Sequence, residues 1–345
     1  MVQTWANKNA FILARAVLNV MLAIEVTPMN GDSCCTPSRG PEILSLNARA
    51  GHEFHRVNAG SLKDMRLIPG GEFLMGANDA DGWPADGEGP VRAVTLQPFH
   101  IDACCVSNEQ FLNFFNATGY KTEAERFGWS FVFHLFLTRG QLARVTGRVA
   151  GSEWWCKVEG VSWRHPEGEG SSIKKRWSHP VVHVSWNDAI AYCVWAGKRL
   201  PTEAEWECAA RGGLVQKRFP WGDELTPSGK HMCNIWQGKF PMNDTGEDGY
   251  IGTAPAKSYQ ANAYGLYNVS GNVWEWCHDW FSPTFHTTGP RIDPIGPPAG
   301  DRRVTRGGSY LCHHSYCNRY RVGARTANTP DSSTGNTGFR CVRDV

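Results

Sequence analysis

The stretch that most constrains this chain runs from Arg306 to Arg321 and reads R-G-G-S-Y-L-C-H-H-S-Y-C-N-R-Y-R. It places two thiols, Cys312 and Cys317, five positions apart, among glycines, histidines and arginines. The thiolate is the form of cysteine that acts as nucleophile and as metal ligand, and nearby cationic groups favour it. This stretch is therefore the first candidate for chemistry.

Several kinds of site fit two cysteines at this spacing. A disulfide, or two small apolar side chains in a core, is the commonest outcome. Structural zinc takes four ligands at tighter spacing, and the chain contains no C-x-x-C motif. Two thiolates alone suit a soft, low-coordinate ion such as Cu(I). From the spacing, the disulfide, the core pair and the copper site all stay open.

Charge and composition narrow the classes of protein. The 345 residues carry a net charge of +2, with no basic stripe interleaved with aromatics, which argues against a nucleic-acid partner. The length allows one large domain or two. With 37 glycines, 20 prolines and 15 tryptophans, the chain is expected to be rich in turns and pinned by aromatic side chains. Twelve cysteines leave the cellular compartment open.

The N-terminal 63 residues are predicted to be a leader that is mostly disordered. Phe11 to Val26 is apolar like a signal-peptide core, but charged residues interrupt it, and it is too short for a transmembrane helix. Met29 is an alternative start, which favours a cytoplasmic protein over an exported one. Gly31 to Lys63 lacks any sustained period. The adjacent Cys34 and Cys35 in this segment are interpreted as functionally silent.

Local patterns predict the elements that follow. M-R-L-I-P-G-G-E-F-L-M-G, from Met65, indicates two short strands around a Pro-Gly-Gly turn, and Val91 to Ile101 indicates another strand. Three helices are expected, over Ser107 to Thr118, over Ser185 to Gly197, and from Thr202, where Glu205 completes a capping box.

Other parts of the chain are harder to assign. Gly128 to Arg176 has many tryptophans and little periodicity, so it is expected to be packed but irregular. His183 is interpreted as a buried structural histidine. Two loops collect oxygen ligands of the kind that calcium takes, one from Asn234 to Tyr250 and one from Asn268 to Glu275. Neither has the EF-hand spacing, and on spacing alone polar turns are favoured.

Taken together, these motifs resemble the formylglycine-generating enzymes, also called sulfatase-modifying factors. The resemblance covers approximately Met65 to Asp344. It rests on P-G-G-E-F-L-M-G, H-P-V-V-H-V-S-W-N-D-A, A-G-K-R-L-P-T-E-A-E-W-E, N-I-W-Q-G-K-F-P, G-N-V-W-E-W, N-T-P-D-S-S, G-F-R-C and the cysteine-bearing stretch from Arg306. The middle motifs are typical of the wider superfamily, whereas the cysteine pair is typical of the activity.

The resemblance implies an α+β fold in one compact catalytic domain, residues 64–345, with little regular secondary structure: the C-type-lectin-like variant of this family. It implies an oxidase that converts the cysteine of a C-x-P-x-R motif in an unfolded sulfatase to Cα-formylglycine, using molecular oxygen and a thiol reductant. Cu(I) would be held by Cys312 and Cys317. The expected partners include no nucleic acid and no membrane.

The resemblance also implies roles for individual residues. Catalysis would use Cys312, Cys317, Ser309 and His313, with Ser309 and His313 lining the oxygen pocket, and the substrate peptide would be bound by Asn336, Arg319 and Tyr316. One structural calcium, distant from the chemistry, would be held by Asn234, Ile235, Asp248 and Tyr250. A second would be held by Asn268, Gly271, Val273 and Glu275.

The chain departs from the family at some positions. A disulfide of secretory members would end at Val322, so it cannot form here, whereas Cys193 and Cys341 occupy the positions of a second one, and whether they pair stays open. These differences make the chain more similar to bacterial members. Two alternatives are kept: an iron-dependent sulfoxide synthase, whose H-x-x-x-H-x-E motif is absent from the sequence, and a non-catalytic lectin-like module, which has no need for both thiols.

Overall fold

The computed structural model describes residues 36–39 and 54–345. The helices are α2 (Asn108–Thr118), α3 (Glu123–Phe127), α4 (Arg139–Leu142), α5 (Trp186–Ala196), α6 (Glu203–Arg211) and α7 (Phe285–Thr288), with 3-10 turns η3 (Pro84–Asp86), η4 (His134–Phe136) and η5 (Pro227–Gly229). No helix in these ranges combines the length and the apolar character needed to cross a bilayer.

The strands form small sheets. They are β1 (Met65–Ile68), β2 (Gly71–Met75), β3 (Arg92–Leu96), β4 (Phe99–Asp102), β5 (Trp129–Phe133), β6 (Val145–Val149), β7 (Ser152–Glu159), β8 (Gly238–Lys239), β9 (Asn243–Asp244), β10 (Trp274–Trp280), β11 (Arg303–Arg306), β12 (Arg325–Asn328), β13 (Thr337–Gly338) and β14 (Val342–Asp344). The sheet orders are β1-β4-β14, β12-β11-β10-β13, β2-β3, β5-β7-β6 and β8-β9.

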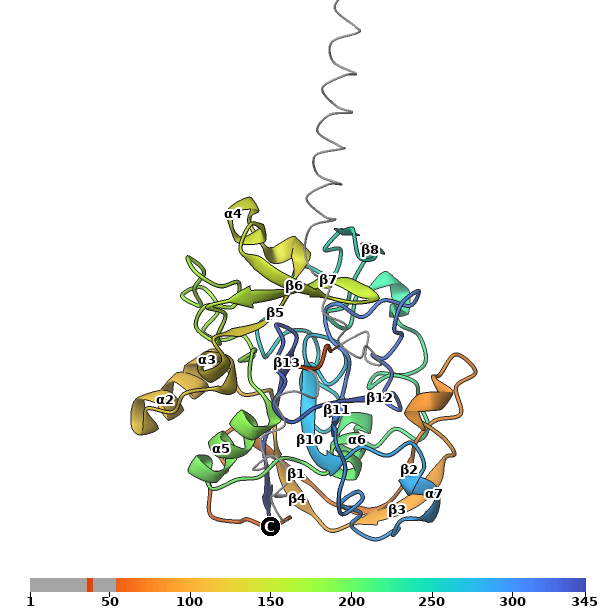
Figure 1. Ribbon diagram of the computed structural model, residues 1–345. Coiled ribbons are helices and arrows are strands. Elements are labelled where there is room, and N and C mark those ends of the chain that lie inside the picture. The colour runs from red at the N-terminus through yellow and green to blue at the C-terminus, as the bar shows by residue number, and fades with distance from the viewer. Residues whose placement is uncertain (1–35, 40–53) are drawn as a thin grey trace, which may run out of the picture.

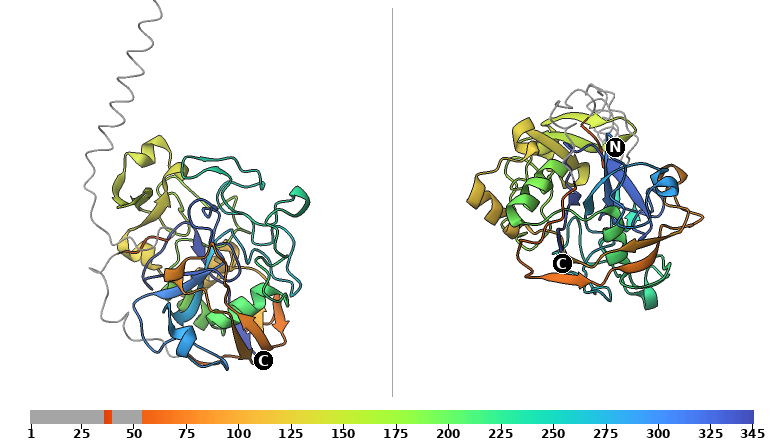
Figure 2. Two further views of the ribbon diagram at one scale, coloured as in Figure 1. Left: turned by 90° about the vertical axis from the view of Figure 1, so that its right-hand side faces the viewer. Right: turned by 90° about the horizontal axis from the view of Figure 1, so that it is seen from below.

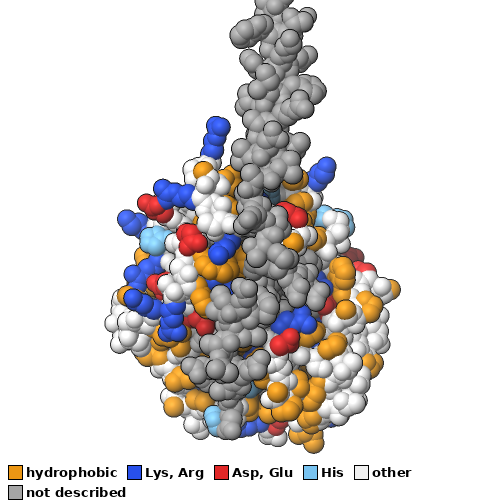
Figure 3. Space-filling view, in the orientation of Figure 1, with side chains coloured by type: hydrophobic (Ala, Val, Ile, Leu, Met, Phe, Trp, Pro, Cys, Tyr) orange, Lys and Arg blue, Asp and Glu red, His pale blue; other side chains and the backbone are white. Residues whose placement is uncertain are grey.

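The β12-β11-β10-β13 sheet lies at the centre of the molecule (Figure 1). The β5-β7-β6 sheet lies above it in that view, and β1 to β4 lie below. Seen from below, the C-terminus lies beside the lower strands, since β14 pairs with β4 (Figure 2). Acidic and basic side chains are interspersed over the face drawn in Figure 3, in keeping with the small net charge. The α+β prediction is confirmed.

The predicted helices are present because their start signals are local. Ser107, Ser185 and Thr202 each accept a hydrogen bond from the third helical N–H and complete a capping box. Phe111 and Phe114 on α2 are buried in a core cluster. His183 is also buried, as predicted.

The two strands predicted around the Pro-Gly-Gly turn are confirmed as β1 and β2, of which β1 pairs with β4 and β2 with β3. Two other expectations need correction. Gly128 to Arg176 is not irregular throughout, because β5, β6 and β7 form an antiparallel sheet within it. Val91 to Ile101 holds two strands, β3 and β4, instead of one.

The predicted leader is partly docked on the domain. The backbone N–H of Val57 donates to the Asp344 carboxylate, and Asp344 N–H returns a bond to the Val57 carbonyl. Residues 36–39 also contact the domain, and Thr36 and Arg39 are buried. The described stretches of the leader therefore contact the domain, and the prediction that the leader is mostly disordered stays a prediction; Cys34 and Cys35 lie outside the described residues.

Buried arginines paired with carboxylates tie the irregular segments together. Arg306 contacts Glu203 and Glu207 on α6, and Arg325 reaches the same Glu203 from β12 at 2.6 Å. Arg340 donates to both oxygens of Glu275 on β10. A buried charge is tolerated only when a partner and hydrogen bonds compensate its desolvation, so each pair fixes the relative position of two segments.

Candidate active site

The cysteine-bearing stretch is a closed loop between β11 and β12. Gly307 and Gly308 have φ of 92° and 73°, a region that glycine enters without a steric penalty. A Cβ on Gly308 would lie 2.9 Å from the Arg319 carbonyl oxygen, too close for any other residue. The backbone at residue 308 therefore packs directly against the backbone at Arg319, and only glycine fits at position 308.

Both cysteines are buried in this loop, with Cys312 1% and Cys317 0% exposed. They share one core cluster with Cys233, Trp274 and Tyr320. The Cys317 N–H donates to the His313 carbonyl at 3.0 Å, which forms a tight turn between the two thiols. The Ser309 N–H donates to the Cys312 sulfur at 3.4 Å, and such a donor favours the thiolate.

Asn336 holds Ser309 in place. Its Nδ2 donates to Ser309 Oγ at 3.0 Å, and its Oδ1 accepts from Thr334 Oγ1 at 2.6 Å. The Leu311 N–H donates to the same Ser309 oxygen at 3.3 Å. Because two N–H groups occupy the lone pairs of Ser309 Oγ, its own hydrogen is directed elsewhere as a donor. Asn336 is fully buried, so the structure gives it a positioning contact that the sequence did not indicate.

Aromatic side chains pack around Ser309 and Cys312. The two residues line a small cavity together with Trp154, Trp155, Phe240, Leu311 and Tyr316. The Tyr316 ring stacks on Phe240 with centroids 4.3 Å apart, and Trp154 meets its edge at 5.1 Å. Trp154 comes from β7, in the region that the sequence indicated to be irregular. The volume of this cavity that a water molecule could enter is about 0 Å³, so its aromatic rings shield the Cys312 sulfur from water.

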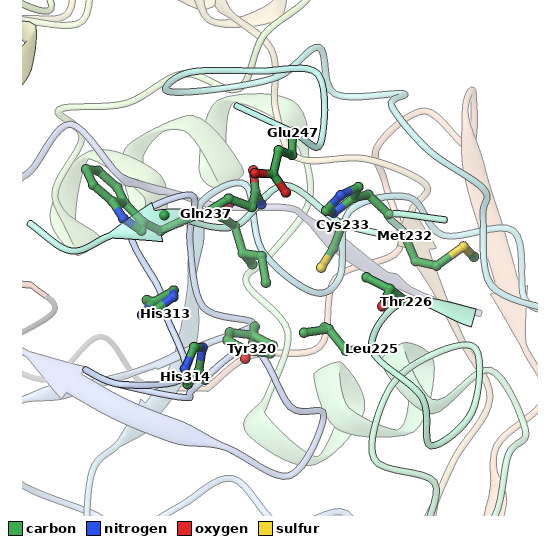
Figure 4. A pocket seen from close by; sticks show the side chains of 13 residues that line it. Leu225, Thr226, Met232, Cys233, Gln237, Glu247, His313, His314 and Tyr320 are labelled. Atoms are coloured by element: carbon green, nitrogen blue, oxygen red, sulfur yellow. The ribbon is translucent and has the colours of Figure 1, made fainter. Parts of the chain in front are cut away.

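His313 lies in a different cavity from Ser309. It lines a pocket of about 210 Å³ with His314, Cys233, Gln237 and Glu247, among others (Figure 4). The rings of His313 and His314 are 4.0 Å apart, and burial, then the neighbouring His314, lowers the pKa of His313. The expected Ser309 and His313 pair is therefore not brought into one pocket by the structure.

Arg319 and Arg321 are held by an acidic loop that the sequence did not assign. Arg319 Nε lies 2.5 Å from Asp86, and Arg321 lies 2.6 Å from Glu88. Trp83 of the same loop donates its Nε1–H to the Cys317 carbonyl at 2.7 Å. Arg319 therefore joins the cysteine loop to the acidic loop through Asp86, which is a role other than the predicted peptide contact. The acidic run D-G-W-P-A-D-G-E was the signal that could have indicated these partners.

The first predicted calcium loop brings its four residues together. Asp248 accepts from the backbone N–H of Ile235 at 2.9 Å and of Tyr250 at 3.0 Å. Asn234 lies beside Ile235, and its Nδ2 donates to the Gly252 carbonyl at 2.9 Å. A carboxylate, an amide and backbone carbonyls gathered in one turn are the donor set that calcium takes.

The second predicted calcium loop lies against the first. The Asn272 N–H donates to the Asn234 carbonyl at 2.7 Å, and Gly271 has φ of 75°. Asn268 Oδ1 is buried and has no hydrogen-bond partner among the described residues, as expected for an oxygen that awaits a cation. The Glu275 carboxylate, however, also accepts hydrogen bonds from Arg340 and Trp206, so its negative charge is already paired with Arg340.

Both loops contact the cysteine loop directly. The Trp236 N–H donates to the Cys312 carbonyl at 3.1 Å, and Tyr310 N–H donates to the Asn272 carbonyl at 2.9 Å. The Gly271 N–H reaches the Gly307 carbonyl at 2.8 Å. The expectation that these loops are distant from the chemistry is therefore wrong for their backbone contacts. Cys193 and Cys341, whose pairing the sequence left open, place their sulfur atoms 3.6 Å apart, beyond disulfide bonding.

Comparison with known proteins identifies the family. The model of the sulfatase-modifying factor enzyme 1-like domain matches residues 51–345. The formylglycine-generating enzyme of Thermomonospora curvata is 64% identical over 285 residues, covering 82% of this chain and 94% of that protein. The enzyme of the same name from Mus musculus is 55% identical, covering 82% and 76%.

A solved structure agrees at the level of fold. PvdO from Pseudomonas aeruginosa superposes with a TM-score of 0.61 at 24% identity, over 85% of this chain and all of that one. This likeness supports the C-type-lectin-like arrangement, and the family model spans the whole cysteine loop and the described sheets. The chain belongs to the sulfatase-modifying factor family of formylglycine-generating enzymes.

Proposed function

We propose that this chain oxidises the cysteine of a C-x-P-x-R motif in an unfolded sulfatase to Cα-formylglycine, which activates the sulfatase. Relatives named formylglycine-generating enzyme support this class of reaction. The observation that carries the proposal is the burial of Cys312 and Cys317 in one cluster, where Cys312 and Ser309 line the same small aromatic-walled cavity. A purely structural pair has no need of a cavity beside it.

The reaction balances with oxygen and a thiol reductant. The substrate Cβ loses one hydrogen and its bond to sulfur and gains a double bond to oxygen. One substrate thiol, one molecule of oxygen and two reductant thiols give one aldehyde, one hydrogen sulfide, one water and one disulfide. Oxygen is reduced by four electrons, of which two come from the substrate carbon and two from the reductant.

The donor set at the two cysteines fits copper. Two thiolates in an apolar, aromatic setting are the soft ligands that Cu(I) selects, and carboxylates are absent from the described lining of the cavity beside Cys312. Copper(I), when bound, would be held by Cys312 and Cys317 and would supply the one-electron chemistry needed to reduce oxygen.

The protein residues around the sulfur atoms would orient the reactants. Ser309 Oγ–H, directed away from Asn336 and Leu311, would donate to oxygen or to the substrate sulfur in the cavity. Tyr316 and Trp154 would pack against the substrate peptide and exclude water. Asn336 would act through Ser309, by fixing the direction of that hydroxyl.

One experiment tests the activity. The chain is incubated with a C-x-P-x-R peptide, oxygen, Cu(I) and a thiol reductant, and the product is read by mass spectrometry. We expect a peptide that has exchanged its thiol for an aldehyde oxygen, and no product when the peptide cysteine is serine. A peptide that binds but returns unchanged would favour the lectin-like module instead.

We also propose that two calcium ions brace the cysteine loop, one at Asn234, Ile235, Asp248 and Tyr250 and one at Asn268, Gly271, Val273 and Glu275. The orphaned Asn268 Oδ1 and the carboxylate of Asp248 support this assignment. Calcium should raise the melting temperature of the parent chain and no longer raise it fully in Asp248→Asn. Asp244→Asn, in the same loop but outside the ligand set, is the control. If calcium does not change the melting temperature of the parent chain, the two loops are polar turns and the calcium proposal is wrong.

A further inference from the structure

The chain carries in its own N-terminal segment the motif that the proposed reaction acts on. Cys35-Thr36-Pro37-Ser38-Arg39 reads C-T-P-S-R, which matches C-x-P-x-R and occurs once in the 345 residues. Cys35 lies outside the described residues, whereas Thr36 to Arg39 are described and dock on the catalytic domain. In Figure 1 they form the short red segment beside β13.

Arg39 occupies a site built to hold an arginine. Its side chain is buried with 4% exposure, and its guanidinium donates to the carbonyls of Trp129 at 2.8 Å and Asp331 at 3.1 Å. It also donates to Ser333 Oγ at 3.1 Å, while its backbone N–H donates to Ser332 Oγ at 2.8 Å. Several acceptors placed around one planar fork give a geometry that lysine would not satisfy equally.

Charge and aromatic faces complete this arginine site. The guanidinium carbon lies 4.1 Å from the Trp129 ring centroid and 4.4 Å from that of Phe127. Burial lowers the pKa of Arg39 to about 10, and nearby Asp331 and Glu123 oppose this shift. Burial raises the pKa of Asp331 itself, and the positive charge of Arg39 opposes that shift, so the two groups stabilise each other's charged forms.

The proline and serine of the motif are also held by the domain. The Pro37 carbonyl accepts from Asn328 Nδ2 at 3.1 Å, and Ser38 Oγ donates to Asn328 Oδ1 at 2.5 Å. Asn328 is the last residue of β12, and its side chain contacts two consecutive residues of the segment. Main-chain and side-chain contacts of this kind are how a groove recognises an extended peptide.

The walls of this groove continue into the active site. The serines that hold Arg39 lead through Thr334 to Asn336, which positions Ser309. Trp129 on the other wall belongs to the same buried cluster as Leu311, which lines the cavity beside Cys312. Four extended residues span at most about 14 Å, the reach between the arginine and the cysteine of any such motif.

We propose that the segment ending at Arg39 is an internal substrate mimic, seated in the groove that receives the client's C-x-P-x-R peptide. The inference rests on the proposed function, since it takes the client motif from it. A tethered segment competes at an effective concentration that dilution does not lower. The client peptide must displace this segment. The apparent affinity of the peptide is therefore its intrinsic affinity multiplied by the fraction of chains in which the groove is vacant.

The test compares Arg39→Ala with the parent full-length chain. With the mimic's anchor removed, KM for the client peptide should fall at least about threefold at unchanged kcat. Arg39→Lys, which keeps the charge but loses the planar fork, should give an intermediate KM. Arg56→Ala is the matched control, because Arg56 is also N-terminal but pairs with Asp293 and Asp344 outside the groove. An unchanged or raised KM in Arg39→Ala overturns the proposal.

A second readout separates this inference from the proposed function. Amide hydrogen exchange at 127–133 and 328–336 should be faster in Arg39→Ala than in the parent and unchanged in Arg56→Ala. If no variant turns over the peptide but exchange at these stretches still rises, the docking stands and the proposed reaction has failed. If turnover is normal and exchange is the same in all chains, the segment is not seated in the groove and the inference is wrong.

Discussion

Two pairs of buried cysteines in this domain share a residue type but differ in their surroundings. Cys193 on α5 and Cys341 before β14 lie 3.6 Å apart in an apolar core, where burial, then the neighbouring thiol, raises the pKa of Cys341 well above its usual value. Cys312 and Cys317 are as deeply buried, but the Ser309 N–H donates to the Cys312 sulfur, and Cys312 lines a small aromatic cavity.

The comparison teaches that burial alone does not decide what a thiol does. A desolvated thiol whose neighbour is a second thiol stays protonated and inert, whereas a thiol that accepts a backbone N–H bond and lines a cavity can bind a metal and meet a substrate. The first pair is then expected to matter for stability and the second for chemistry. Four experiments test this division.

The largest effect is expected at the cavity-facing pair. Cys312→Ser or Cys317→Ser replaces a soft ligand with a hydroxyl that is normally protonated, so Cu(I) binding should be greatly weakened and turnover lost. Copper titration and peptide turnover measure this. Cys193→Ser should retain both properties. Copper affinity that is unchanged in both the 312 and the 317 variants would remove the distinction.

The next effect concerns the positioning of Ser309. The sequence assigned Asn336 to peptide binding, but its amide donates to Ser309, so Asn336→Ala should lower kcat more than it raises KM. Ser309→Ala should do the same, and the double variant should be little worse than either single one, because both remove one unit. A loss confined to KM would restore the peptide-binding role.

A smaller effect is expected at His313. The structure places it in the pocket with His314 and Glu247, away from the cavity that Ser309 lines. His313→Ala should therefore change kcat/KM by less than about tenfold, and less than Ser309→Ala does. Steady-state kinetics on the same peptide decide the matter. A loss equal to that of Ser309→Ala would place His313 back in the oxygen step, as the sequence predicted.

The smallest effect is expected at the core pair. The raised pKa of Cys341 means that the folded state keeps this proton to higher pH than the unfolded chain does. Its contribution to stability is thus complete below the ordinary thiol pKa and is lost as pH rises above it, by up to about 1.4 kcal/mol per pH unit. Denaturant unfolding between pH 8 and 10 should show this slope in the parent, flattened in Cys341→Ala. Equal slopes would show that the pair is not desolvated.

Features encoded locally could be predicted from the sequence. Ser107, Ser185 and Thr202 each carry their capping partner three residues on, so the helix starts follow from a few neighbouring letters. The cysteine pair was recognised in the same way, from its own spacing and neighbours.

Features that depend on distant partners could not be predicted. In the β5-β7-β6 sheet, β5 is buried along its whole length and β7 buries Trp155 and Cys156 in succession, so no period of two marks these strands. Asp86 reaches Arg319 across more than two hundred residues, and Asn336 reaches Ser309 from beyond a strand. Only the folded chain shows which arginines hold the cysteine loop in place. It also shows that His313 and Ser309 line different cavities.

The buried arginines that join these segments also govern how the molecule comes apart. Glu203 is shared by Arg306 and Arg325, and Glu275 serves Arg340, so opening one segment strands a charge in the interior of another. Such a half-open state carries an uncompensated desolvation penalty and is sparsely populated. We therefore expect the domain, despite its short strands, to unfold as one cooperative unit in which the cysteine loop does not loosen by itself.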